Sequence, residues 1–199
     1  MEHGLVNKAT IAGVWREEWP EYTLVIPAEE PVSRQVKQMR LQWKMEFGED
    51  VGSEKPPGVM MAAWAARKEQ EETMVRLIGN LAERLESFVV TLNNFSGIPP
   101  QVIYIRVQDA EPFKKITTQL KEVLELIGNE DTYRIVERPI IKLGSFPKNE
   151  NHQQWYKYTH QLFHAAFTAS KLVLFRHEEG ECKTIGVFPF KKLTNWPTS

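Results

Sequence analysis

Few side chains in this sequence stand at spacings that would let them act together in chemistry. His160 and His164 are four residues apart within a segment, 151–166, whose apolar spacing predicts a helix. Both imidazoles would project from one helical face, as in some metal sites. No third ligand and no carboxylate accompanies the pair at a suitable spacing. We therefore expect both, and His177 beside a predicted turn, to be surface residues, and we predict neither a metal nor a cofactor.

Lys142 is the residue best suited to bind an anion. It follows two isoleucines in a strand-like segment, where its ammonium group would bind a phosphate or a carboxylate as a point charge. The alternative is that its stem crosses apolar surface while the charged end reaches water. Met60, Trp64 and Phe146 offer surface on which a flat ligand would stack, unless they fill the core instead.

The composition limits the classes of function that remain. The chain has 199 residues, enough for a sizeable core, and its 25 basic and 26 acidic side chains nearly cancel. No overall field attracts nucleic acid or an anionic membrane, so any anion recognition must be local. A single cysteine, Cys182, excludes an internal disulfide and a thiol-based zinc cluster. No segment has the pattern of a signal peptide or a membrane span, and we expect a soluble, cytoplasmic protein.

Hydrophobic periodicity predicts an alternation of strands and helices. The predicted strands are 22–27, 59–64, 88–92, 102–107, 140–146, 171–175 and 184–188, and the predicted helices are 31–47, 71–85, 113–127 and 151–166. A turn is expected over 93–100, where Asn, Gly and Pro gather, and a hairpin turn over 177–181. Residues 1–20 have weak periodicity and are expected to form a short docked helix or an arm for a second subunit.

The order of elements contains an internal repeat. A strand-helix-strand-helix-strand pattern occurs twice and is followed by one closing strand. Pro57 and Pro139, 82 residues apart, open corresponding strands. The two halves share this pattern without sequence identity. The repeat predicts two similar lobes that face each other across a cleft, within a single domain over 21–199.

The chain resembles the two-histidine phosphoesterase superfamily, which includes the 2′,5′ RNA ligase-like (LigT-like) proteins and the cyclic phosphodiesterases. Members combine an apolar strand that ends in proline, two His-x-Thr strands, a Phe-x-Val-x-Leu strand before a Gly-Pro turn, a Val-Ile-Tyr-x-x-Val strand and a Phe-Pro-Phe end. The matching segments here, in that order, are 22–27, 55–61 with 139–143, 88–100, 102–107 and 188–190. The resemblance implies an α+β, LigT-like fold in which each lobe is an antiparallel sheet with helices outside, facing a central cleft.

The resemblance also identifies the positions where the family has its catalytic residues. In the family, one histidine removes a proton, the other protonates the leaving oxygen, and each threonine helps hold the phosphate. At the matching positions this chain has Gly58 and Met60 in the first strand, and Ile140 and Lys142 in the second. Glycine, methionine and isoleucine side chains cannot transfer a proton. The resemblance therefore implies a pseudoenzyme with no catalytic residue at this site.

Strand alternation extends these positions into two walls of the cleft. The walls would consist of Gly58, Met60, Ala62 and Trp64 on one side, and of Ile140, Lys142, Gly144 and Phe146 on the other. The intervening residues would line the lobe cores: Val59, Met61, Ala63, Ile141 and Leu143. A mostly apolar cleft with one ammonium group suits a ligand with an apolar or aromatic body and an anionic group.

Three functions remain open. The first is a 2′,5′ RNA ligase/cyclic phosphodiesterase-like protein that has lost catalysis and acts as a ligand-binding or regulatory module. The second is an enzyme with relocated groups, Lys142 with Tyr104, Arg106 or the helix histidines, acting on a phosphoester or nucleotide. The third is a subunit that packs on another protein through residues 1–20 and the cleft. As partners we expect a small anionic or nucleotide-like ligand, RNA with weaker support, self-association through the N-terminal arm, and no membrane.

Overall fold

The structure is a computed structural model that describes residues 19–47, 56–98, 102–127, 133–145, 156 and 158–191. These residues form two antiparallel sheets and the helices that pack on them. In chain order the elements are β1 (Glu21–Pro27), α2 (Val32–Phe47), β2 (Gly58–Ala65), η1 (Lys68–Gln70), α3 (Glu71–Ala82), β3 (Phe88–Ile98), β4 (Val102–Val107), α4 (Glu111–Ile127), β5 (Tyr133–Ile135), β6 (Ile140–Ser145), β7 (His164–Ala169), β8 (Lys171–Glu178) and β9 (Glu181–Pro189).

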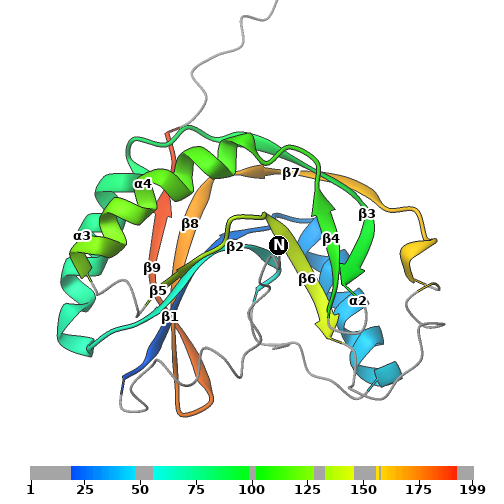
Figure 1. Cartoon of the computed structure of the whole chain (residues 1–199), viewed down its shortest axis with the longest axis horizontal. Coiled ribbons are helices and arrows are strands. Elements are labelled where there is room, and N and C mark those ends of the chain that lie inside the picture. The colour runs from blue at the N-terminus through cyan, green and yellow to red at the C-terminus, as the bar shows by residue number, and fades with distance from the viewer. Residues whose placement is uncertain are drawn as a thin grey trace, which may run out of the picture.

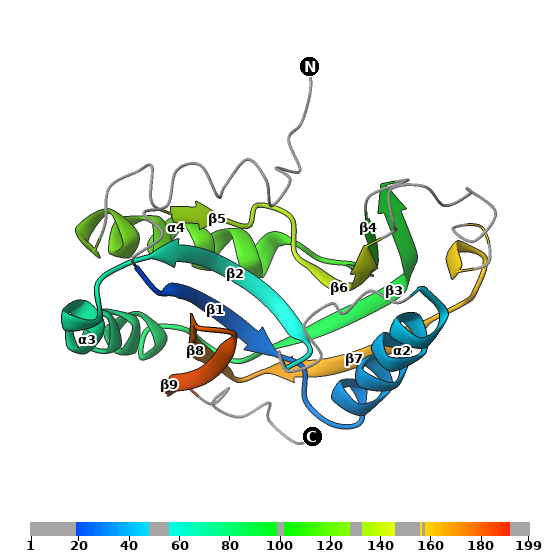
Figure 2. The same cartoon turned by 90° about the horizontal axis from the view of Figure 1, so that it is seen from below.

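The first sheet has five strands in the order β5-β2-β1-β8-β9, which lie side by side in Figure 2. β1 lies at its centre, and its alternate residues Tyr22, Leu24 and Ile26 are fully buried. The helix α3 covers this face: the Tyr22 hydroxyl donates to Glu71 at 2.8 Å, and Arg176 of β8 pairs with the same carboxylate. Burial, together with this hydrogen bond to Glu71, raises the pKa of the Tyr22 phenol.

The second sheet has four strands in the order β6-β4-β3-β7. The strands β3 and β4 pair closely, with Ser96 opposite Tyr104. The helix α2 packs on one face of this sheet through Trp43 and Phe47, which are buried and in mutual ring contact. The Trp43 indole also donates a hydrogen bond to the Ser145 carbonyl of β6 at 3.3 Å. This helix therefore fixes β6, the strand that carries the second set of candidate residues.

The two halves of the chain exchange their helices. The helix α2 follows β1 of the five-stranded sheet but packs on β6 and β7, and α4 follows β4 of the four-stranded sheet but packs on β5 and α3. Figure 1 shows α3 and α4 together on the outer side of the five-stranded sheet, and α2 beside β4 and β6. One hydrophobic cluster draws residues from both sheets and all three of these helices. The core is therefore shared between the lobes.

The predicted α+β class, with two antiparallel sheets and helices packed on them, is confirmed. The hairpin turn between β8 and β9 is confirmed as well: Glu179 and Gly180 have φ angles of 51° and 84°, the pair of positive values that favours a two-residue hairpin turn. No helix within the described ranges is long and apolar enough to cross a membrane. Of the predicted arm, 1–20, only Trp19 and Pro20 fall within those ranges.

Other element predictions are wrong. The helix predicted over 151–166 is contradicted at its end, because 164–169 form β7 and pair with β3. Tyr156, Tyr158 and Thr159 are helical, and 151–155 and 157 lie outside the described residues. The turn expected over 93–100 is strand as far as Ile98, because β3 continues along β4 after a register shift between Leu92 and Phe95. The short strand β5 has no counterpart in the sequence pattern.

Candidate ligand-binding site

The strands that carry the candidate positions, β2 and β6, contact each other where the two sheets meet. They share one irregularity. The β1–β2 register skips Met61, and the β4–β6 register skips Leu143. Each skipped residue lies three positions after the first candidate residue of its strand, Gly58 or Ile140. Both strands therefore have a β-bulge at the same place, which agrees with the internal repeat.

In β2, Gly58 and Met60 lie on the face that α3 does not cover. They pair with Pro27 and Val25, which alternate with the fully buried residues of β1. Met60 is partly exposed. Position 58 has no room for a side chain, because a Cβ there would collide with the Ile26 carbonyl oxygen. Gly58 therefore contributes only backbone to this face.

Trp64 lies on the opposite face of β2 from Met60, contrary to the sequence-based alternation. The bulge at Met61 reverses the alternation, so that Trp64 pairs with Tyr22 and Ala62 pairs with Leu24. The Trp64 and Tyr22 rings stack with their centroids 6.0 Å apart, and Trp64 is only 2% exposed. A side chain buried to this extent offers little surface to a ligand.

In β6, Ile140 and Lys142 share a face with the β4 residues opposite them, Arg106 and Tyr104. Lys142 is exposed and Ile140 is half-buried. The backbone here is held from the other side by α2: the Nε and Nη2 atoms of Arg40 donate to the Lys142 carbonyl at 3.1 and 3.0 Å. Burial lowers the pKa of the Arg40 guanidinium.

Gly144 is not part of the wall that sequence alternation assigns to it. The bulge at Leu143 turns Gly144 toward α2, where the Trp43 ring lies directly against it. Phe146, the remaining residue predicted for this wall, lies outside the described residues. The second strand thus presents Ile140 and Lys142 on the site face, and the residues after them turn to the core.

A pocket of about 210 Å³ opens beside Ile140. Its walls come from β4, from the segment before α4 and from the connection between β5 and β6: Tyr104, Arg106, Val107, Ala110, Arg138, Pro139 and Ile140. Pockets that enclose a drug-sized ligand usually measure about 300–1,000 Å³, so this one fits a single group of a ligand. A wider depression of about 360 Å³ follows the exposed side of α2 alone, and no cationic residue lines it.

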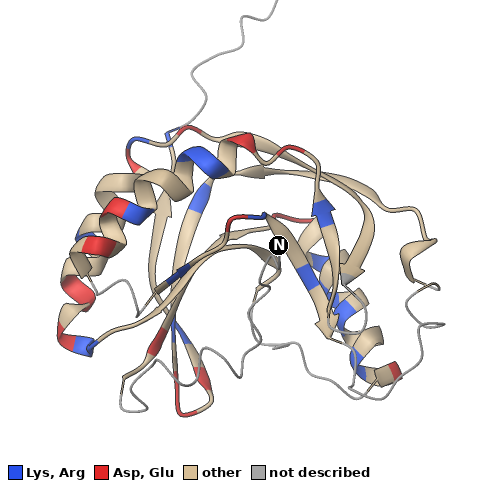
Figure 3. Cartoon of the chain, in the orientation of Figure 1, with Lys and Arg blue, Asp and Glu red and all other residues tan. Residues whose placement is uncertain are grey.

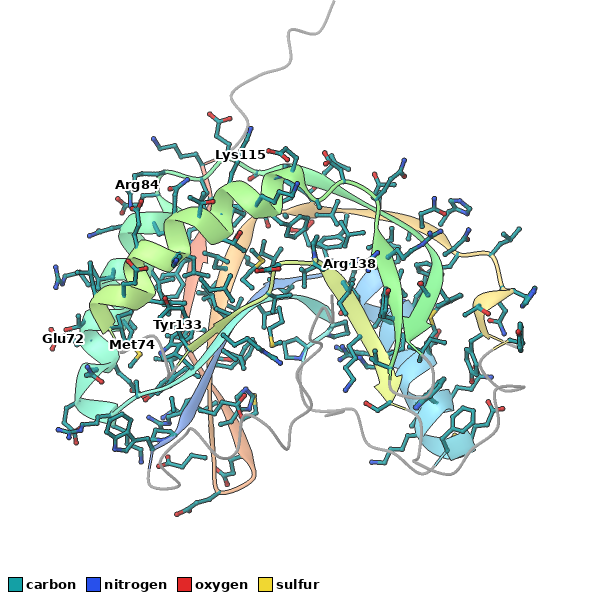
Figure 4. All side chains as sticks on the ribbon, viewed as in Figure 1. Glu72, Met74, Arg84, Lys115, Tyr133 and Arg138 are labelled. Carbon is teal, nitrogen blue, oxygen red and sulfur yellow. The ribbon has the colours of Figure 1, made fainter. Side chains whose placement is uncertain are left out.

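Arg106 and Arg138 make the pocket beside Ile140 positive. Neither has an ion pair within the part of the chain that the structure describes, and no carboxylate lines the pocket. The Nε of Arg106 donates to the Asn93 carbonyl at 3.2 Å, which orients the guanidinium. β4, β6 and the β5–β6 connection each carry one basic residue, and in the connection Glu137 precedes Arg138 (Figure 3). Arg138 lies near the start of β6 (Figure 4). Guanidinium groups so arranged suit a phosphate or a carboxylate.

Sequence reasoning does not single out Arg138. An arginine in an irregular connection has no periodic neighbours, and the chain has many other basic residues. Its one distinguishing feature is that it stands two residues before Ile140, the position matched to the second histidine of the family. That spacing places Arg138 just before the start of β6 and hence beside the pocket.

His177 lies on the same face of the five-stranded sheet as Met60. It pairs with Glu21 of β1, and its Nε2 atom is 2.8 Å from the Thr23 hydroxyl oxygen, within hydrogen-bonding distance. Thr23 is 3% exposed and His177 is half-buried. His177 is therefore a partly exposed residue, as a surface position predicts, with a buried hydroxyl as its neighbour.

His160 and His164 do not share a helical face. His160 is exposed and hydrogen-bonded to the Tyr156 carbonyl, whereas His164 begins β7. Among the residues with described positions, no group of three or more His, Cys, Asp and Glu side chains lies close enough to hold a metal ion.

No protein-family model and no curated protein matches this chain. Solved structures do match it. TT0787 of Thermus thermophilus has a TM-score of 0.67 at 16% identity, covering 87% of this chain and 100% of that chain. Escherichia coli LigT complexed with NADP⁺ has a TM-score of 0.57 at 12% identity, covering 87% and 96%. The same protein complexed with 3′-AMP has a TM-score of 0.58 at 11% identity, covering 87% and 99%.

A further solved structure, described as a phosphoesterase, has a TM-score of 0.57 at 13% identity and covers 87% of this chain and 97% of its own. Identities this low leave the activity open, but the coverage extends over both sheets. The chain has a LigT-like fold.

Proposed function

We propose that this chain binds a small, phosphate-bearing ligand of the nucleotide class in the pocket beside Ile140, and that it has lost the two-histidine phosphodiester chemistry. The observation that carries the proposal is the pair of arginines, Arg106 and Arg138, around a pocket sized for one anionic group. The LigT-like fold adds support, because Escherichia coli LigT has been crystallised with NADP⁺ and with 3′-AMP. Lys142, on the same face, would add a third positive charge.

The absence of an acid and a base at the matched positions supports the loss of catalysis. Ile140 lines the pocket but has no ionisable group. Gly58 cannot be replaced by histidine without moving the β1 backbone, because even a Cβ collides there. Hydrogen bonds to charged groups are typically worth about 1.5–3 kcal/mol, so two such bonds would give a dissociation constant between about millimolar and tens of micromolar without any chemistry.

Titration calorimetry with adenosine 5′-monophosphate tests this function. We expect Arg138→Ala to weaken binding by about tenfold or more, because a charge-assisted hydrogen bond is lost. Arg84→Ala is the matched control, because Arg84 is exposed on the helix-covered side of the molecule (Figure 4). This variant should bind the nucleotide as the wild type does. No measurable binding by the wild type, or binding that Arg138→Ala leaves unchanged, would sink the proposal. Steady turnover of a 2′,3′-cyclic nucleotide would refute the loss of catalysis.

A second candidate function is an enzyme with relocated groups. The observation that favours it is the hydrogen bond between His177 and Thr23, which puts an imidazole on the same sheet face as Met60. Such an imidazole would serve as general base or acid, with Lys142, Tyr104 and Arg106 supplied by strands of the other sheet. Turnover that is abolished in His177→Ala and retained in Arg84→Ala would favour this candidate over the first.

A further inference from the structure

The geometry points to a second anion subsite at Arg134, so that the ligand carries two separate anionic groups, as a nucleoside bisphosphate does. This inference rests on the proposed function, since it adds a subsite to the pocket that Arg106 and Arg138 form. Arg134 belongs to β5, the edge strand of the five-stranded sheet, and the pocket belongs to the other sheet. A ligand held by both would bridge the two lobes.

The register of β5 places Arg134 on the site face. Arg134 pairs with Ala63 of β2, and Ala63 pairs with Thr23 of β1. Thr23 alternates with the buried residues under α3, and it lies on the same side as Val25 and its partner Met60. Arg134 is therefore on the face with Met60. Tyr133, its neighbour, pairs with Trp64 and lies on the helix-covered face (Figure 4).

The Arg134 guanidinium is partly withdrawn from water. Its Nε atom is buried and has no hydrogen-bond partner, and no described carboxylate forms an ion pair with it. A buried donor on a cation is costly to leave unsatisfied. The same protein pairs Arg176 fully, with Glu71 and Glu178. Arg134 is partly exposed, so an anion from the ligand would pair with its terminal Nη atoms, as Glu71 pairs with Nη1 of Arg176.

The chain length between Arg134 and Arg138 limits how far apart the two subsites can be. Arg134 and Arg138 are four residues apart, and extended chain advances at most about 3.3–3.6 Å per residue, so their Cα atoms are separated by about 14 Å or less. The acid between them, Glu137, is exposed. A ligand with phosphates at two separate positions, such as the 3′ and 5′ oxygens of one ribose, can reach both arginines within this limit.

The test compares adenosine 5′-monophosphate with adenosine 3′,5′-bisphosphate by titration calorimetry. For the wild type we expect the bisphosphate to bind about tenfold tighter. Arg134→Ala should remove this preference while leaving the monophosphate affinity unchanged, because only the second phosphate loses its partner. Arg138→Ala should weaken both ligands, and Arg84→Ala should weaken neither.

The outcomes separate the inference from the function on which it rests. Monophosphate binding without a bisphosphate preference, or a preference that survives Arg134→Ala, overturns the second subsite and leaves the proposed function standing. Failure of both nucleotides to bind overturns both. If Arg134→Ala fails to fold, Arg134→Gln takes its place, since it keeps most of the stem and removes the charge, and the same loss of preference is expected.

Discussion

At position 144 the lack of a side chain lets α2 approach β6. The Trp43 ring occupies the space that a Cβ would need, so Gly144→Ala must displace a fully buried indole that also donates to the Ser145 carbonyl. Overpacking of this kind typically costs about 1–3 kcal/mol. We expect a loss of that size in the free energy of unfolding, measured by urea denaturation.

Gly79→Ala is the control for this substitution. Gly79 lies within α3, and a Cβ there would meet the Phe188 ring at 3.7 Å, an ordinary contact. Because alanine favours helix over glycine by about 0.5–1 kcal/mol, Gly79→Ala should leave stability unchanged or raise it. Equal losses in the two variants would mean that the Trp43 contact is not what makes position 144 sensitive.

At the scale of the element, alternate residues of β6 have different roles: some pack in the core and others face the candidate site. Ile141 is fully buried under α2, whereas the Lys142 side chain is exposed and its backbone carbonyl accepts from Arg40. Ile141→Ala should therefore cost about 2–5 kcal/mol of unfolding free energy and leave nucleotide affinity nearly unchanged in the folded fraction. Lys142→Ala should leave stability within about 0.5 kcal/mol and weaken the nucleotide.

Denaturation and calorimetry on the same preparations check both halves of this prediction. Unfolding of Lys142→Ala would show that its side chain is structural and would remove it from the site. A stable Ile141→Ala variant would show that the face assigned to the core is wrong.

Long periodic elements were predictable from sequence, and irregular ones were not. The spacing of Phe113, Ile116 and Leu120 gives α4 directly, because a helix buries residues three and four apart. The sequence pattern mispredicts β7. Its alanines favour a helix, and the segment is a strand because it pairs with β3. The three residues of β5 are too few to show any period.

The candidate site was predictable only up to the bulges. Sequence alternation correctly puts Met60 with Gly58, and Lys142 with Ile140. After the bulge it reverses, because one extra residue moves every later side chain to the other face. Alternation alone therefore assigns Trp64 to the site, whereas it lies in the core, which is the other alternative that the sequence left open. Arg138 in the β5–β6 connection belongs to no periodic pattern, because its position beside the pocket depends on where the chain crosses between the sheets.

At the scale of the whole molecule, the exchange of α2 and α4 makes the lobes interdependent. Each sheet is covered partly by a helix that follows a strand of the other sheet, and the buried residues form one cluster. We expect differential scanning calorimetry to show one unfolding transition, with equal calorimetric and van't Hoff enthalpies. Two resolved transitions, or a Gly144→Ala variant in which only part of the heat absorption shifts, would contradict a shared core.

The exchange also governs what happens when the backbone is interrupted between β3 and β4. A fragment of residues 1–98 retains β1 and β2 without the neighbours β5 and β8, and a fragment of residues 102–199 retains β4, β6 and β7 without α2. Neither fragment contains a complete sheet together with the helix that covers it, so each alone should remain unfolded. Mixed together, they have every complementary surface needed to reassemble, which makes this chain a natural candidate for a split reporter.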